Sequence, residues 1–195
     1  MTKAGLGERC EFFKPQYFEH PDDERIRKAA DQVRVHRAML RHVVEGLRGL
    51  DIRERESAGK TKTLKLVEEP LWKISEAFGK YNTRYFSENA VRSVVDRFGQ
   101  RRSAGLQHDH IVPRKKLVEM LFEKEATFDR VVRLCVGCAV LKGEHPRLTA
   151  SEQNVDLRDV WAKYRDANIR VVDCKTGTFV HLTTAHSDID GWATF

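Results

Sequence analysis

The first half of the chain has the hydrophobic spacing of amphipathic helices. Over residues 21–50, apolar side chains recur mostly three and four positions apart and charged side chains fill the positions between them, which predicts one long helix with a buried face. A second helix is expected over residues 64–78, kinked or split at Pro70. A third is expected over residues 89–98, with Ser87 as its N-terminal cap. The N-terminal half is therefore predicted to be mainly helical.

The pattern changes after Gly105. Residues 106–113 are β-compatible and end in proline, and residues 114–124 favour a helix or a tight loop. Residues 131–141 are expected to hold a second strand and the start of a helix. These segments predict a small ββα-like unit over residues 106–148.

The C-terminal part combines a helix with a β-hairpin. Residues 155–167 place apolar side chains on one helical stripe, and residues 169–172 and 178–182 are β-branched runs on either side of a turn that contains Gly177. The predicted fold class is α+β, with a mainly helical N-terminal half, the ββα-like unit, and this C-terminal helix and hairpin. The three regions, expected to pack as one compact domain, are 1–100, 101–150 and 151–195.

Composition supports a globular chain. With 195 residues, 41% of them hydrophobic, the chain can form the core of one domain. Its longest apolar run, from Leu134 to Leu141, is far shorter than the roughly 20 residues of a membrane-spanning helix. The N-terminal segment has no apolar signal core, so a cytoplasmic location without membrane contact is predicted. The aromatic residues at helical spacings are predicted to be core residues: Trp72, Phe98, Trp161 and Tyr164.

One stretch is rich in side chains that can do chemistry: His108, Asp109 and His110 follow one another on the strand expected before Pro113. Histidine can accept a proton near neutral pH, and a carboxylate is a hard ligand suited to Mg²⁺ or Mn²⁺. Together they supply what metal-assisted phosphodiester hydrolysis needs, a base for water and a cation for the developing charge. The alternative is a surface strand with solvated side chains.

Two short motifs carry a resemblance to a known family. Residues 109–113 read Asp-His-Ile-Val-Pro, and residues 134–142 read Leu-Cys-Val-Gly-Cys-Ala-Val-Leu-Lys. The first resembles the opening Asp/Glu-His-Ile/Val-x-Pro motif of the HNH endonucleases, the ββα-metal nucleases, and the second resembles their closing Leu-Cys-x-x-Cys-His-x-x-Lys motif. Arg130 and Ala139 stand where that family has an asparagine and its last metal-binding histidine or asparagine.

The resemblance implies a hairpin and a helix that hold one divalent ion, Mg²⁺ or Mn²⁺. By that resemblance His110 is the general base and Asp109 is a metal ligand. His108 or His145 is expected to complete the coordination, because Ala139 cannot.

Cys135 and Cys138 form a CxxC pair, which supplies half of a tetrahedral zinc site. Spacing alone does not choose the residues that would complete a structural Zn²⁺ site; the candidates are His145, Cys10, Cys174 and His181. The competing interpretation places both cysteines in the core as small hydrophobic residues.

The charge distribution points to a polyanionic partner. Lys and Arg number 35 against 29 Asp and Glu, a formal net charge of +6, and basic clusters lie on both sides of the His-Asp-His segment. Cations beside such a site suit contact with a phosphate backbone. The residues predicted to contact nucleic acid are Arg101, Arg102, Arg114, Lys115, Lys116 and Lys142.

These observations predict a metal-dependent HNH-like endonuclease that acts on nucleic acid, DNA rather than RNA. One alternative is a nucleic-acid-binding module with a degenerate, inactive site, and another is a helical interaction protein of a phage or defence locus. The long N-terminal helix is expected to be a scaffold, a contact in a homodimer or an arm that positions DNA.

Overall fold

The computed structural model describes residues 23–50, 60–94, 105–123, 128–151, 157 and 159–180. These residues form a mixed α+β fold with a helical N-terminal half, so the predicted fold class is confirmed. In the described parts of the chain, no helix is both long and apolar enough to cross a membrane.

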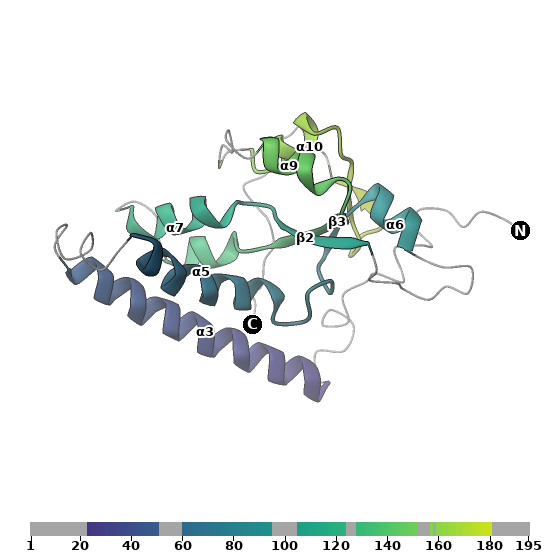
Figure 1. Cartoon of the computed structure of the whole chain (residues 1–195). Coiled ribbons are helices and arrows are strands. Elements are labelled where there is room, and N and C mark those ends of the chain that lie inside the picture. Colours follow the sequence, from purple (N-terminus) through teal and green to yellow (C-terminus); the bar gives the residue numbers. More distant parts are fainter. Residues whose placement is uncertain are drawn as a thin grey trace, which may run out of the picture.

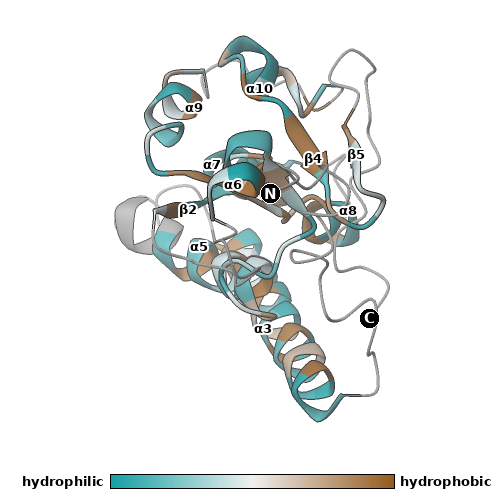
Figure 2. Cartoon of the chain, turned by 90° about the vertical axis from the view of Figure 1, so that its right-hand side faces the viewer, coloured by the Kyte–Doolittle hydropathy of each residue, from teal (hydrophilic) through white to brown (hydrophobic). Residues whose placement is uncertain are grey.

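The long helix α3 (Glu24–Gly49) forms where the periodicity predicts it. The Asp23 carboxylate accepts a hydrogen bond from the Arg25 backbone N–H at 2.8 Å, which caps the first turn. Hydrophobic and hydrophilic residues are interspersed along α3 at helical spacing, as the two colours in Figure 2 show. Its buried face packs along α5 (Lys60–Glu76), the neighbouring helix in Figure 1. The helix α3 therefore supports α5 through its buried apolar face.

Pro70 lies inside α5 and does not split it, so the helix runs unbroken to Glu76. Val67, Leu71 and Ile74 are fully buried on the same face of this helix. Burial of this apolar face offsets the backbone hydrogen bond that proline removes.

A five-stranded sheet joins the three regions within the described residues. The spatial order of its strands is β2-β3-β1-β4-β5, with β1 parallel to β3 and the other neighbours antiparallel. The strands are β1 (Tyr85–Ser87), β2 (Leu106–His110), β3 (Gly137–Leu141), β4 (Val171–Asp173) and β5 (Thr178–Phe179). The sequence interpretation missed β1, because three residues are too short to show a period of two.

The helix after β1 is α6 (Glu88–Val94). Its cap is the predicted one, since the Ser87 hydroxyl oxygen accepts the Ala90 backbone N–H at 3.1 Å. The remainder of the helix expected over 89–98, after Val94, lies outside the described residues.

Between β2 and β3 the chain forms α7 (Arg114–Phe122) and α8 (Phe128–Arg133), and α9 (His145–Ser151) follows β3. The strand predicted within 131–141 is confirmed as β3, but the predicted helix start is wrong, because the segment holds the end of α8 and α9 begins only at His145. β3 is buried on both faces between β2 and β1. Such a strand has no alternation to distinguish it from a buried helix.

The C-terminal hairpin of β4 and β5 is confirmed, with Gly177 in the turn at φ +72°. The helix expected over 155–167 is shorter in its described part, where α10 spans Ala162–Asp166. Trp161 and Tyr164 are nonetheless buried as predicted.

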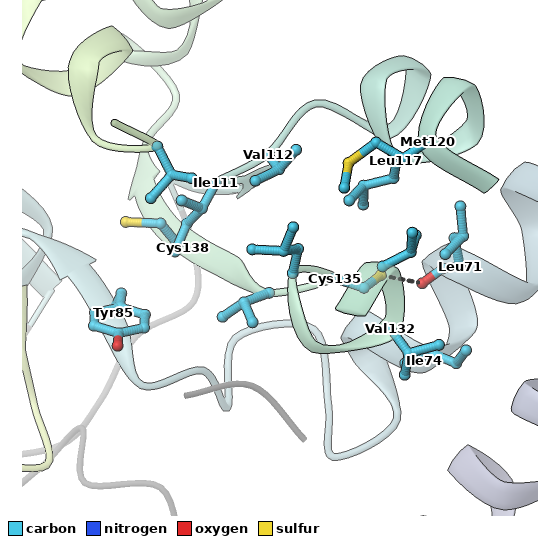
Figure 3. Close-up of a cluster of buried hydrophobic side chains, with 14 of the residues drawn as sticks. Leu71, Ile74, Tyr85, Ile111, Val112, Leu117, Met120, Val132, Cys135 and Cys138 are labelled. Atoms are coloured by element: carbon cyan, nitrogen blue, oxygen red, sulfur yellow. Dashed lines mark hydrogen bonds between the residues drawn. The ribbon is translucent and has the colours of Figure 1, made fainter. Parts of the chain in front are cut away.

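Both faces of the sheet are covered. Tyr85 and Cys138 belong to the larger core, part of which is drawn in Figure 3, whereas their neighbours Phe86 and Ala139 belong to a smaller cluster on the other face. In Figures 1 and 2, β2 lies between α3 and α5 on one side and α9 and α10 on the other. This position brings residues from distant parts of the sequence around the β2 edge.

Candidate functional site

The candidate site is a cavity of about 540 Å³ beside β2, at the edge of the sheet. The first residues of α7, the start of α9 and one face of α5 form the rest of its wall. The lining includes Glu68, Trp72, Glu76, His108, Asp109, His110, Arg114, Lys115 and His145. Most of the candidate site residues that the sequence predicts near residue 110 therefore line this cavity.

His110 is held by a short hydrogen-bond chain. Its Nε2 lies 3.0 Å from the Ser75 hydroxyl oxygen, and that hydroxyl donates to the Trp72 carbonyl at 2.8 Å. A serine hydroxyl has one hydrogen, so when Ser75 donates it to Trp72, Ser75 accepts the Nε2–H of His110. This assignment leaves Nδ1 of His110 as the basic nitrogen.

The pKa of His110 is well below its usual value, chiefly because burial disfavours the imidazolium. Nearby His108, Arg114 and Lys163 lower it further by charge repulsion. A neutral imidazole is the form that can accept a proton from water.

Asp109 points to the face of β2 opposite His110, and both residues line the cavity because β2 is the edge strand of the sheet. Asp109 is already paired. Its Oδ2 lies 2.8 Å from Nζ of Lys163 and accepts the Tyr164 hydroxyl at 2.5 Å. Asp109 and Lys163 are both buried, and Lys163 Nζ also donates to the His110 carbonyl at 2.5 Å. One carboxylate oxygen of Asp109 is therefore engaged by an ammonium group, and its role as a metal ligand stays a prediction that depends on Oδ1.

The sequence interpretation missed Lys163 and counted Tyr164 only as a core residue. The helical stripe correctly predicted that this part of α10 is buried. No pattern in the sequence indicates that a lysine would turn inward there, because its partner Asp109 lies on a distant strand.

The other oxygen of Asp109 faces His145, the first residue of α9. The distance from His145 Nε2 to Asp109 Oδ1 is 3.9 Å. Metal bonds of about 2.1 Å from each donor span at most about 4.2 Å, so both groups can reach one Mg²⁺ or Mn²⁺ ion. Within the described ranges, no group of three or more His, Cys, Asp or Glu side chains is arranged to hold a metal. The donors thus fit an ion that keeps several waters, as Mg²⁺ does.

His108 does not join this pair. The strand alternation places it on the face of His110, with the two ring centroids 5.1 Å apart. Its Nδ1 lies 2.7 Å from the Lys80 carbonyl, and burial lowers its pKa. A Cβ on Gly137 would lie 2.1 Å from the ring, so the glycine is needed for the ring to fit. The ring of His108 therefore packs β2 on β3 on the face opposite Asp109, and the prediction of His108 as a ligand stays a prediction.

The residues predicted to contact phosphate lie in different places. Arg114 and Lys115 line the cavity, whereas Lys116 faces Glu119 and Glu123 at 3.5 and 3.7 Å. Lys142 is exposed in the turn between β3 and α9. The predicted contacts Arg101 and Arg102 lie outside the described residues.

The two CxxC cysteines lie in the core. Cys135 donates its thiol hydrogen to the Leu71 carbonyl at 3.0 Å, as Figure 3 shows, and burial raises its pKa to about 12. Burial, and secondly Asp109, raise the pKa of Cys138 well above its usual value. These buried surroundings fit the interpretation of both cysteines as small hydrophobic core residues, and the structural Zn²⁺ site stays a prediction.

The described residues include two of the four residues proposed to complete a zinc site, His145 and Cys174. His145 lies beside Asp109, and Cys174 belongs to the smaller core cluster. Cys10 and His181 lie outside the described residues.

Two further residues gain a role from the structure. Trp72, predicted to be core, is 41% exposed and lines the cavity. Glu144 is buried and accepts hydrogen bonds from the Ser87 hydroxyl, the Asn89 amide and the Leu141 backbone N–H. It ties α6 to the turn before α9 and so fixes the start of the helix that carries His145.

No protein-family model, curated protein or solved structure matches this chain.

Proposed function

We propose that this protein is a metal-dependent, HNH-like phosphodiesterase that cleaves nucleic acid, DNA in preference to RNA, in the cytoplasm. One observation carries the proposal: His145 of α9 and Asp109 of β2 lie 3.9 Å apart in the wall of a cavity that also contains His110. Strand β2, which pairs antiparallel with β3, supplies Asp109 and His110, and the helix after β3 supplies His145.

Each residue has a separate task in the proposed reaction. His110, kept neutral by burial, accepts a proton from the attacking water. Asp109 Oδ1 and His145 Nε2 would hold Mg²⁺ or Mn²⁺, which when bound stabilises negative charge on the phosphate and the leaving oxygen. Arg114 and Lys115 bind phosphate from the cavity wall.

A second candidate function is nucleic-acid binding without cleavage. The observation that favours it is the pairing of Asp109 Oδ2 with Lys163, because an ammonium at 2.8 Å already neutralises this carboxylate. In that case Arg114 and Lys115 would still bind a phosphate backbone.

Cleavage of supercoiled plasmid and of single-stranded DNA, with Mg²⁺ and, separately, with Mn²⁺, tests the proposal. His110→Ala is expected to reduce the rate by on the order of 10²–10⁴, because alanine cannot accept a proton. DNA binding should remain, since the phosphate contacts come from other residues. His42→Ala, on the exposed surface of α3, is the matched control and should cleave like the wild-type chain.

The two candidate functions give different results in this assay. Wild-type protein that binds DNA but cleaves nothing with either metal, together with an unchanged His110→Ala variant, would favour the binding module and exclude the phosphodiesterase.

A further inference from the structure

Trp72 is an exposed indole in the wall of the cavity. Its exposed fraction is 41%, and it is the one aromatic residue among the large exposed hydrophobic side chains of the described ranges. Exposed aromatic faces are the platforms on which proteins stack unpaired bases.

The cavity has two chemically different sides. Arg114 and Lys115 lie at the start of α7, whereas Glu68, Trp72 and Glu76 lie on α5. The three α5 residues are spaced four apart, which puts them on one face of the helix. A phosphate is attracted to the basic side. On the other side the two carboxylates outnumber Lys80, which follows α5 and also lines the cavity. The α5 side instead offers an aromatic face and carboxylate acceptors for amino groups, which is the chemistry of a base site.

Trp72 is also linked to the proposed base of the reaction. Its carbonyl accepts the Ser75 hydroxyl, and Ser75 in turn accepts from His110. One turn of α5 therefore fixes both the indole's backbone and the His110 ring. A base stacked on Trp72 would bring its own phosphate close to His110 and to the cationic side of the cavity.

We propose that the cavity binds one unpaired nucleobase, stacked on Trp72, with the adjacent phosphate at Arg114 and Lys115. The volume of about 540 Å³ lies within the range of small-ligand sites. A base within a duplex has both faces covered by its neighbours, so it cannot stack on a side chain. The substrate class is thus single-stranded or locally opened nucleic acid. This inference rests on the proposed function only for the identity of the ligand as nucleic acid.

Binding without metal tests the inference separately from cleavage. The probe is a short fluorescent single-stranded DNA, compared with the same sequence as a duplex, in the presence of EDTA. Trp72→Ala should weaken single-strand binding by about tenfold or more, since stacking is the interaction removed. Duplex binding should change less than about twofold, because phosphate contacts dominate it. Trp72→Phe keeps an aromatic face and should retain most single-strand affinity.

Leu66→Ala is the matched control, since Leu66 is an exposed apolar residue of the same helix that does not line the cavity. Thermal melting checks that each variant folds. Equal single-strand affinity of wild type and Trp72→Ala, or an equal loss on both probes, would overturn the base site. A selective loss in Trp72→Ala without any cleavage by the wild type would support the base site and reject the phosphodiesterase.

Discussion

At the scale of single residues, the site depends on a buried lysine. Lys163 contacts two consecutive residues of β2, the Asp109 carboxylate and the His110 carbonyl. It is a positioning residue, because it acts through these groups. Its ammonium also makes the burial of a carboxylate tolerable, since an unpaired buried charge is strongly unfavourable.

Replacement of Lys163 by methionine should therefore destabilise the fold. The substitution leaves Asp109 buried and unpaired, which costs about 3–5 kcal/mol in comparable buried pairs. The free energy of unfolding in urea measures the effect. Arg34→Met, which removes an exposed pair with Asp31, is the control and should cost less than about 1 kcal/mol. A Lys163→Met variant as stable as Arg34→Met would show that the buried pair does not form.

At the scale of elements, the basic residues at the start of α7 point in different directions. Arg114 and Lys115 line the cavity, and Lys116 is paired with acidic residues of its own segment. Three consecutive basic residues in the sequence are thus not equivalent, because successive positions on a helix point about 100° apart.

Neutralising Arg114 and Lys115 together should weaken DNA binding and flatten its salt dependence. Each phosphate contact contributes about 0.7–0.9 to the slope of log K against log salt, so the slope should fall by about 1–2. Titrations at several salt concentrations measure it. Lys116→Ala is the control and should leave the slope unchanged. The opposite result, with the effect in Lys116→Ala, would place the phosphate contact outside the cavity.

At the scale of the whole molecule, the site is assembled from separate regions. Strand β2 supplies Asp109, α9 supplies His145 and α10 supplies Lys163. The shared sheet and the flanking helices in Figure 1 hold these elements together. A ligand that bridges two of them should therefore stabilise the folded chain.

Mn²⁺ should raise the melting temperature if Asp109 and His145 bind it together. An ion that binds only the folded state stabilises by about 2.7 kcal/mol at a hundredfold excess over its Kd, which shifts melting by several degrees. His145→Ala should lose most of that shift, because it removes one of two ligands. His145 is partly exposed, so its removal should leave the apo fold near wild-type stability. Equal shifts in both chains would show that the ion binds elsewhere.

Much of the fold follows from local sequence patterns. The apolar spacing before Leu50 predicts α3, the serine before α6 predicts its cap, and the β-branched runs around Gly177 predict the C-terminal hairpin. These features depend on residues a few positions apart, and local backbone geometry alone links them. The same holds for the candidate chemistry at Asp109 and His110, which is visible as adjacent side chains on a short strand.

Tertiary structure decided which of these side chains meet. The sequence did not show that Asp109 pairs with Lys163 and faces His145, that His108 packs on Gly137, or that Trp72 is exposed. The sequence also did not show that α8 ends before β3 begins, because burial on both faces of the interior strand β3 removes the alternation that identifies a strand. Periodicity reports which side of an element is apolar, whereas the partner of a buried polar group depends on how distant elements pack against each other.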